Sequence, residues 1–186
     1  MDYQILVNKD HPISKEVIKQ IELHPIMERE QLFYLDKKVI KQYLNLKKRV
    51  WQKTGILIAL DSAYRSIEEQ QEIIEEMRQE YGKVYTDHYV SKPGESEHHT
   101  GLALDLTIYE NDHYLRNNYE LESAISKFRK IYLFLGYYGF ILRYPKGKEH
   151  ITKIPSEIWH IRYVGVKVVK QLKKKNQVLE QYKKKL

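Results

Sequence analysis

The stretch that decides the fold is SEHHTGLALDL, residues 96–106. Its second half alternates, and the leucines share one face of the strand that this alternation predicts: Leu102, Leu104 and Leu106. The opposite face carries Gly101, Ala103 and Asp105, which together offer little bulk and a single carboxylate. We therefore expect the leucines to pack on a core and the other face to form the floor of a pocket.

A second stretch, EIWHIRY at residues 157–163, shows the same period of two. Its aromatic and aliphatic residues alternate with His160 and Arg162, so these two polar side chains share a face of the predicted strand. If the two strands lie side by side with their polar faces turned the same way, His160 approaches Asp105. His98 precedes the first strand and is close enough to turn toward the same side.

These three residues form a ligand set for a metal ion. Zinc accepts two imidazoles and a carboxylate in tetrahedral geometry, and three protein ligands leave a fourth position for water. A metal in such a site lowers the pKa of its water to about 7, and Glu157, three residues before His160, is expected to act as the general base. Read singly, a histidine is more often a hydrogen-bonded or surface residue, so the pattern alone leaves a structural role open.

The rest of the chain predicts a mixture of helices and short strands. Apolar periodicity and capping residues, among them Asp36 and the pair Ser66 and Glu69, indicate helices over residues 36–52, 66–81, 119–138 and from 166 onward. Short apolar runs indicate strands over residues 56–60, 140–142 and 159–163. Because the elements follow no regular βαβ alternation, the fold class is α+β, with a small antiparallel sheet flanked by helices.

Composition narrows the class of protein. The chain has 186 residues, which predicts a single domain, and it lacks cysteine, so any metal must be held by histidine, aspartate or glutamate. No run approaches the roughly 20 apolar residues of a membrane span, and the start shows no secretory signal. If Met1 is the native start, a cytoplasmic protein is expected.

The positive charge lies at the C-terminal end. From Lys167 onward the chain has eight lysines and one acid, Glu180, which accounts for the whole net charge of +7. A neutral body with a basic end does not predict a nucleic-acid groove. A solvated, lysine-rich final helix is the favoured interpretation, with contact to an anionic partner as the alternative.

Several motifs in order resemble one peptidase family. Residues 96–105 (Ser-x-His-x-x-Gly-x-Ala-x-Asp) and 157–165 (Glu-x-Trp-His-x-Arg-Tyr-Val-Gly) are similar to the zinc D-Ala-D-Ala carboxypeptidases of the VanY and VanXY type, which share the fold of the lysostaphin, D-Ala-D-Ala peptidase and sonic hedgehog group. Further similar segments are residues 6–12, 63–70, 93–98 and 138–145. The resemblance thus implies one peptidase domain over residues 1–186, with a catalytic body of about residues 6–165 and a basic C-terminal helix over 166–186.

The resemblance assigns roles to individual residues. It implies one zinc ion, held by His98, Asp105 and His160. It also makes Glu157 the catalytic base and Arg65 the group that polarises the scissile carbonyl and stabilises the oxyanion. Two further positions match residues that hold the substrate backbone or its terminal carboxylate: Ser96 and Gln70. Aromatic side chains at Tyr144 and Trp159 are candidates for the pocket wall.

Two positions depart from the family pattern. His99 stands where the family often has glutamine, so it is a candidate to donate a hydrogen bond to a metal ligand or to be an alternative ligand, although a solvent-facing side chain is the more common role. Ile158 replaces the usual proline of Glu-Pro-Trp-His, which loosens the backbone restraint on Glu157.

The function that the resemblance implies is zinc-assisted hydrolysis of D-Ala-D-Ala termini of peptidoglycan precursors, and of the free dipeptide, in a VanXY-like cytoplasmic arrangement. Removal of that terminus would deprive glycopeptide antibiotics such as vancomycin of their target. An L,D-carboxypeptidase of cell-wall tetrapeptides is the first alternative. A non-catalytic zinc-binding module is the second, and the presence of both Glu157 and Arg65 argues against it. No nucleic-acid partner is expected, and residues 82–92 and 108–120 are the expected rims of the site.

Overall fold

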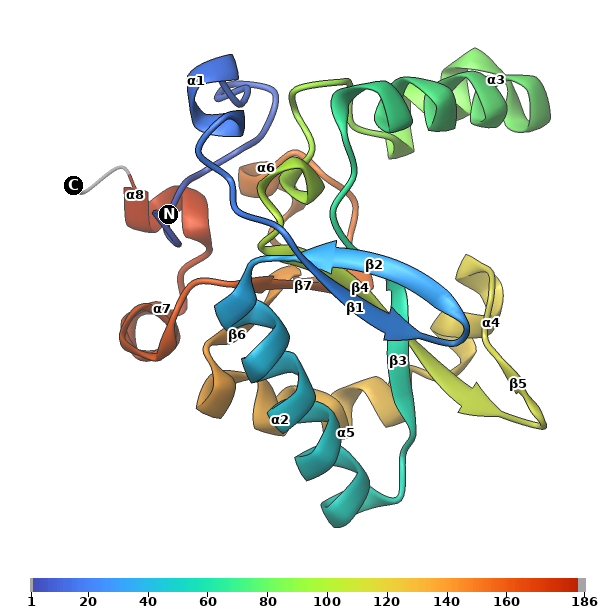
Figure 1. The fold of residues 1–186 in the computed structure, drawn as a ribbon, viewed down its shortest axis with the longest axis vertical. Coiled ribbons are helices and arrows are strands. Elements are labelled where there is room, and N and C mark those ends of the chain that lie inside the picture. Colours follow the sequence, from blue (N-terminus) through green and yellow to red (C-terminus); the bar gives the residue numbers. More distant parts are fainter. Residues whose placement is uncertain (1, 184–186) are drawn as a thin grey trace.

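The computed structural model describes residues 2–183, and its centre is an antiparallel sheet. The strand order is β3 (Ile58–Ser62), β4 (Ala103–Glu110), β7 (Glu157–Tyr163) and β6 (Phe140–Tyr144), and the short β5 (His113–Tyr114) pairs with the far end of β4. Figure 1 shows helices packed around this sheet rather than alternating with it. The predicted α+β class with a small antiparallel sheet is confirmed.

The two alternating stretches are neighbouring strands, as predicted. In the β4–β7 pair Asp105 lies opposite His160, and Ala103 lies opposite Arg162. A cross-strand pair of this kind brings side chains on the same face into contact. The register therefore brings a carboxylate and an imidazole together at the centre of the sheet.

The leucine face of β4 packs on the main core. Leu102, Leu104 and Leu106 are buried there with the apolar stripes of two helices, α2 (Lys37–Thr54) and α5 (Ile125–Leu135). The buried positions of α2 are those that the periodicity predicts: Val39, Tyr43, Leu46 and Val50. Asp36 caps this helix through bonds to the amides of Lys38 and Val39, which confirms the predicted start.

A hairpin that the sequence analysis did not predict covers the same core. It consists of β1 (His24–Glu28) and β2 (Gln31–Leu35), and it crosses over the sheet in Figure 1. Its turn places Arg29 and Glu30 at φ angles of 52° and 60°. Two-residue turns with positive φ are usually marked by Asn-Gly or Asp-Gly, so the Arg-Glu pair hid the hairpin.

The predicted helix over residues 119–138 is wrong as a single element. The structure has α4 (Asn118–Ser123), α5 (Ile125–Leu135) and a 3₁₀ turn, η2 (Gly136–Tyr138). The helix breaks at Ala124, whose φ and ψ are −87° and 13°, and the hydroxyl of Ser123 donates to the carbonyl of Glu120. The apolar stripe continues across the break. The helical period of the apolar residues therefore shows that both helices bury the same face, but it does not show that they form one helix.

The helix that begins after Ser66 ends at a kink, as predicted, and a second helical segment follows it. Helix α3 spans Ile67–Tyr89, with a non-helical Gly82 (φ 82°, ψ 165°) in its interior, and it projects from the body of the molecule in Figure 1. The predicted capping box is present, because the Ser66 hydroxyl accepts from the Glu69 amide and the Glu69 side chain accepts from the Ser66 amide. The predicted end near Tyr81 coincides with this kink, and the second helical segment continues from there to Tyr89.

The basic C-terminal segment is two helices rather than one. Helix α7 (Val166–Lys175) ends at Asn176, which adopts the left-handed conformation, and α8 (Leu179–Lys183) follows; residues 184–186 of the predicted helix lie outside the described residues. The remaining elements are short: α1 (Lys15–Ile18), η1 (Glu97–Thr100) and α6 (Glu149–Thr152). Within residues 2–183, no helix has the length and apolar character needed to cross a membrane.

Candidate metal centre

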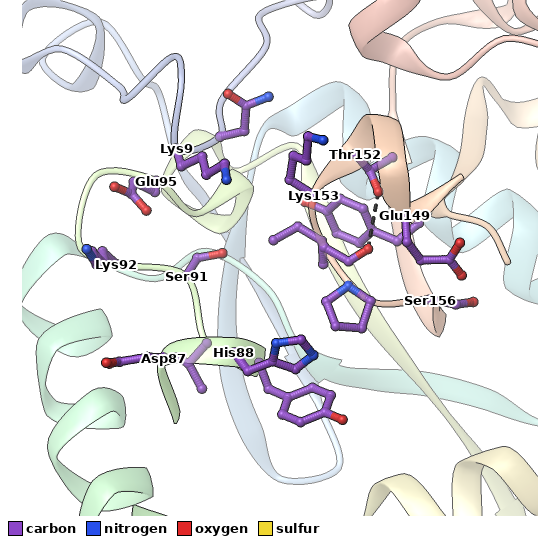
Figure 2. A pocket seen from close by; sticks show the side chains of 16 residues that line it. Lys9, Asp87, His88, Ser91, Lys92, Glu95, Glu149, Thr152, Lys153 and Ser156 are labelled. Atoms are coloured by element: carbon purple, nitrogen blue, oxygen red, sulfur yellow. Dashed lines mark hydrogen bonds between the residues drawn. The ribbon is translucent and has the colours of Figure 1, made fainter. Parts of the chain in front are cut away.

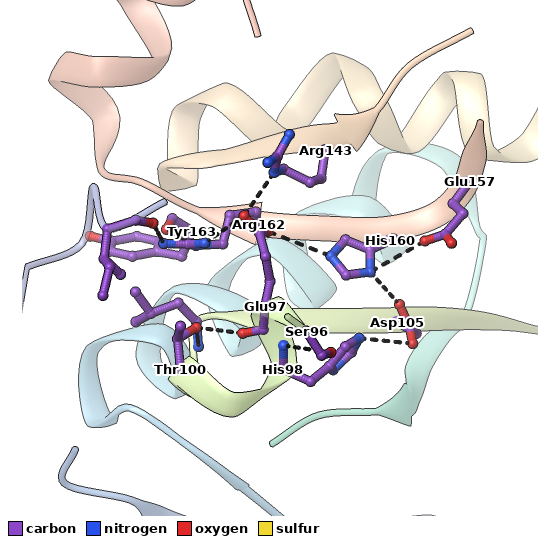
Figure 3. A network of polar contacts seen from close by, with 12 residues as sticks. Ser96, Glu97, His98, Thr100, Asp105, Arg143, Glu157, His160, Arg162 and Tyr163 are labelled. Atoms are coloured by element: carbon purple, nitrogen blue, oxygen red, sulfur yellow. Dashed lines mark hydrogen bonds and ion pairs between the residues drawn. The ribbon is translucent and has the colours of Figure 1, made fainter. Parts of the chain in front are cut away.

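Three side chains from three elements meet on the polar face of the sheet. His98 comes from η1, Asp105 from β4 and His160 from β7 (Figure 3). One donor atom from each lies within 4.8 Å of the other two, and all three residues are buried. Nε2 of His98 is 3.2 Å from Oδ2 of Asp105, and Nδ1 of His160 is 3.0 Å from Oδ1. The predicted meeting of these residues is therefore present in the structure.

A 3₁₀ turn places His98 at the site. The Ser96 hydroxyl caps η1 by accepting a hydrogen bond from the His98 amide at 3.3 Å. The turn ends at Gly101, whose φ of 65° lies in the left-handed region. A Cβ atom at this position would also lie 2.8 Å from Cδ2 of Leu23. The backbone angle thus favours glycine at 101, and a side chain there would also require the Leu23 methyl group to move.

The His98 ring is oriented by its other nitrogen. Nδ1 lies 2.5 Å from the carbonyl oxygen of Ala63, so it carries the proton and donates it, and Nε2 turns its lone pair toward Asp105. A ligating histidine commonly donates its second ring N–H to a backbone carbonyl, because this bond selects the tautomer that binds metal.

The donor set fits a zinc ion. Oδ1 of Asp105 is buried and forms no hydrogen bond within the described part of the chain, although Nδ1 of His160 is 3.0 Å away. The two atoms lie close enough together to bind one shared cation. Two imidazoles and one carboxylate suit zinc, and His98, Asp105 and His160 are the whole cluster of this kind among residues 2–183.

The three ligands and their charged neighbours have strongly shifted pKa values. Burial acts to raise the pKa of Asp105, but the two imidazoles outweigh it and hold that pKa well below its usual range. Burial, assisted by the Arg65 charge, lowers the pKa of His98 to about 4. Burial also opposes protonation of His160, yet Asp105 and the neighbouring glutamates raise its pKa to about 9. At neutral pH His98 is neutral and His160 holds a proton that a metal cation would displace.

Glu157 lies beside the ligands at the start of β7. Its Oε2 is 3.5 Å from Nδ1 of His160 (Figure 3). Burial raises the pKa of Glu157 to about 7, and the negative charges of Asp105 and Glu97 act in the same direction, against His160 and Arg65. A carboxyl with a pKa near the working pH can both accept and return a proton, which is what a general base requires.

Arg65 brings a fixed positive charge to the same place. Its NH2 donates to Oδ2 of Asp105 at 3.2 Å, its Nε donates to the Ser62 hydroxyl at 3.0 Å, and its NH1 donates to Oε1 of Gln70 at 3.1 Å. Gln70 is buried and donates in turn to the carbonyl of Ser91 at 2.9 Å. Gln70, predicted to hold substrate, thus positions Arg65 in this structure.

The expectation of a solvent-facing His99 is wrong. The turn of η1 buries this ring, its Nδ1 lies 2.7 Å from the carbonyl oxygen of Arg65, and its Nε2 accepts from the Gly94 amide at 3.0 Å. Because both ring nitrogens are engaged, His99 is not an alternative ligand. It ties the backbone that carries Arg65 to the loop that leads into His98.

A buried network of ion pairs, which was not predicted, lies next to the ligands. Glu97 is fully buried, and its Oε1 lies 2.8 Å from Nε of Arg143 and 2.8 Å from NH1 of Arg162 (Figure 3). Arg143 also forms two bonds with Glu180 of α8, at 2.7 and 3.0 Å. The available signal was an arginine alternating with apolar residues in each of two strands, since such a charge needs a buried partner.

The ligands face a cavity that continues into a larger one. The cavity at the site has a volume of about 200 Å³, and Tyr144 and Trp159 line it, as predicted. A second cavity of about 730 Å³ shares part of its wall with the first: Tyr89, Val90, Ser91, Tyr144 and Ile154. Figure 2 shows Lys9, Lys92 and Lys153 around this second cavity. The end of α3 and the residues after it form a rim, in agreement with the expectation for residues 82–92, whereas no residue of the second expected rim, 108–120, lines either cavity.

Comparisons with known proteins agree with this geometry. Residues 32–166 match the model of the VanY D-alanyl-D-alanine carboxypeptidase family. The chain is 35% identical over 182 residues to the bifunctional D-Ala-D-Ala dipeptidase and carboxypeptidase VanXYC of Enterococcus gallinarum, which covers 95% of this chain and 91% of the relative. It spans between 47% and 64% of the length of three further relatives that it matches.

Solved structures of similar proteins share the fold. A mutant of the vancomycin-resistance D,D-pentapeptidase VanY in complex with Zn(II) has a TM-score of 0.73, 28% identity and coverage of 98% of this chain and 99% of its own. The D,D-dipeptidase VanXYg in complex with a D-Ala-D-Ala phosphinate analogue has a TM-score of 0.80, 28% identity and coverage of 98% and 70%. The LD-carboxypeptidase LdcB has a TM-score of 0.75, 32% identity and coverage of 97% and 85%.

The family match spans more than half of the chain and includes the two strands that carry Asp105 and His160. The chain therefore belongs to the VanY D-alanyl-D-alanine carboxypeptidase family and is a peptidase.

Proposed function

We propose that this protein is a zinc-dependent D,D-carboxypeptidase that removes the terminal D-alanine from D-Ala-D-Ala ends of peptidoglycan precursors. The observation that carries the proposal is the convergence of His98, Asp105 and His160 beside Glu157, whose Oε2 lies 3.5 Å from a ligand nitrogen. Binding of a metal alone requires neither a carboxyl with a pKa near 7 nor an arginine at the ligands. The presence of both supports catalysis over a non-catalytic zinc module.

One zinc ion at the three ligands would supply Lewis-acid polarisation of the carbonyl and a lower pKa for water. Glu157 accepts the proton of the attacking water as the C–O bond forms, and it returns this proton to the nitrogen of the departing D-alanine as the C–N bond breaks. Arg65 directs its guanidinium at the carbonyl oxygen, where negative charge develops. Its contacts with Ser62, Gln70 and Asp105 hold it there before substrate arrives.

The cavities support a substrate longer than a dipeptide. A carboxypeptidase releases a single residue, so the space beyond the site serves the peptide on the N-terminal side of the scissile bond. The adjoining cavity of about 730 Å³ lies within the range of roughly 300–1,000 Å³ that is typical of ligand sites. We expect Ser96 and Gln70, which both line the site, to contact the substrate, and Gln70 also holds Arg65. Action on the free dipeptide, a VanXY-like role in glycopeptide resistance and a cytoplasmic location stay predictions.

A second candidate activity is L,D-carboxypeptidase action on tetrapeptides. The similarity to the LD-carboxypeptidase LdcB, at 32% identity and a TM-score of 0.75, supports this second activity. Both activities use the same metal chemistry and differ in the configuration of the residue before the scissile bond. Release of D-alanine from a D-Ala-D-Ala pentapeptide, compared with release from the tetrapeptide, separates them.

The test of the proposal is the zinc content and D-alanine release of the wild type and of Glu157→Ala. We expect one zinc per chain in both proteins and a loss of turnover of about 10²–10⁴-fold in the variant, because the general base is removed and the ligands are not. Unchanged turnover would remove Glu157 from the mechanism. Loss of zinc in the variant would make Glu157 a ligand, and a wild type that binds no zinc would end the proposal.

A further inference from the structure

The second ring nitrogen of His160 faces a buried carboxylate that the mechanism above does not use. Nδ1 of His160 points to Asp105 and Glu157, and Nε2, on the other side of the ring, lies 3.8 Å from Oε2 of Glu97. Nε2 and Oε2 are both buried, and neither has a hydrogen-bond partner within the described part of the chain. Two opposed polar atoms without partners are costly in an interior unless they come to bond each other.

Glu97 is fixed so that one oxygen remains for His160. Its Oε1 is held by Nε of Arg143 and NH1 of Arg162, each at 2.8 Å. The two arginines approach Oε1 and leave Oε2 directed at the imidazole (Figure 3). The carboxylate therefore cannot turn away without breaking two buried ion pairs.

The network that holds Glu97 is anchored at both ends of the chain. Arg143 binds both carboxylate oxygens of Glu180 in α8, and NH2 of Arg162 donates to the carbonyl of Ile5 at 2.7 Å. Two arginines face two glutamates, so the charges of these four side chains balance without a contribution from His160. A charge-balanced, buried network of this kind is rigid, and it fixes the position of Glu97.

The aromatic contacts of the His160 ring fix its plane but not the position of its proton. The ring of Tyr144 packs against the face of the imidazole with centroids 4.8 Å apart, and the ring of His98 meets it edge-on at 5.0 Å. These contacts limit tilting of the ring. They do not decide which nitrogen carries the proton, which is a matter for hydrogen-bond partners alone.

We propose that Glu97 is a positioning residue that accepts the Nε2 proton of His160 and so presents Nδ1, with its lone pair, to the metal. The contact closes to a hydrogen bond when the ion occupies the site, and the arginine network keeps the acceptor in place. Glu97 then does for His160 what the carbonyl of Ala63 does for His98. This inference rests on the proposed zinc function, because it concerns the affinity of the same site.

Glu97→Gln is a sharp test because the network dictates how the amide lies. The two arginine donors keep the amide oxygen, so the NH2 group faces Nε2 of His160 and a donor meets a donor. The ring is then driven toward the tautomer with its proton on Nδ1, the ligand atom. We expect the affinity for Zn(II), measured by competition with a chelator, to fall about 10–100-fold.

Glu180→Gln is the matched control, since it removes the same charge from the same network without facing His160. It is expected to weaken Zn(II) binding much less than Glu97→Gln does, because both oxygens of Glu97 stay in place opposite His160. Glu97→Asp keeps the charge that the arginines require but moves the carboxylate away from the imidazole. It therefore tests the same contact if Glu97→Gln does not fold. Its Zn(II) affinity is expected to fall as well.

A proton NMR signal gives a readout that a merely structural role would not move. In the zinc-loaded wild type we expect a slowly exchanging imidazole proton on Nε2 of His160, shifted downfield by the carboxylate, and its loss in Glu97→Gln. Equal Zn(II) affinity in wild type and Glu97→Gln would overturn this inference and leave the proposed function intact. An equal loss in Glu180→Gln would overturn it in favour of general network stability. A wild type that does not bind Zn(II) would end both proposals.

Discussion

At the scale of single residues, the two imidazole ligands have opposite protonation tendencies. Both rings are buried, but His98 has a carbonyl partner and the nearby Arg65 charge, whereas His160 is surrounded by carboxylates. The pKa of His98 is lowered to about 4, and the pKa of His160 is raised to about 9. Metal and proton therefore compete at one ligand of the site.

This asymmetry predicts a pH dependence of zinc binding. His160 is protonated in the metal-free protein below pH 9, so binding at pH 7 must release its proton. We expect the apparent affinity for Zn(II) to fall about tenfold for each unit of pH lowered between 8 and 6, as one proton is displaced per ion. Chelator competition at several pH values measures the slope, and calorimetry in buffers of different ionisation enthalpy counts the protons. An affinity that does not change over this range would contradict the prediction.

At the scale of elements, short-range signals predicted where helices begin but not where all of them end. The caps at Asp36 and Ser66 were recognisable because each depends on residues within one turn of the cap. The break at Ala124 and the left-handed Asn176 carry no proline or glycine to mark them. The positive-φ turn of the β1–β2 hairpin is formed by Arg29 and Glu30, which are uncommon at such positions.

The turn that carries His98 yields a prediction on stability. Gly101 and Gly55 both adopt left-handed angles, with φ of 65° and 67°, but only Gly101 has close neighbours, while a Cβ at Gly55 would meet nothing within 4 Å. Gly55→Ala is therefore expected to cost about 1–2 kcal/mol of unfolding free energy, from the backbone alone. Gly101→Ala is expected to cost slightly more, because the Leu23 methyl group must also move, and to weaken Zn(II) binding through strain in the turn that carries His98.

Urea denaturation of the two variants gives the free energies, and chelator competition gives the zinc affinities. Equal losses of unfolding free energy would show that the neighbours of Gly101 move aside without lowering the stability further. A normal zinc affinity in Gly101→Ala would show that the position of His98 does not depend on this turn.

At the scale of the whole molecule, the two ends of the chain meet behind the metal ligands. The carbonyls of Tyr3 and Ile5 accept from Arg162, and Glu180 of α8 binds Arg143. Figure 1 shows the N-terminal segment beside α8. The basic C-terminal segment, expected to be a solvated helix, thus contributes one buried acid to the support of the site.

Removal of this segment is predicted to destabilise the protein. A chain that ends at Asn176 lacks Glu180 and leaves the buried Arg143 with Glu97 as its one acidic partner among the residues that the structure describes. Breaking a buried pair in this way costs about 3–5 kcal/mol. The truncated protein should unfold at a lower urea concentration than the full chain. An unchanged midpoint after the truncation would contradict the assigned role of Glu180.

The sequence by itself determined the donor types, the faces on which they lie and the helix caps. These features depend on a period of two or on neighbours within a turn, and both can be recognised in SEHHTGLALDL and EIWHIRY without coordinates. Tertiary structure decided the register that sets Asp105 opposite His160, the burial of His99, the network around Glu97 and the cavities beside the site. Each of these joins segments far apart in the chain, and a buried charge or ring takes its partner from whichever strand or turn the packing places next to it.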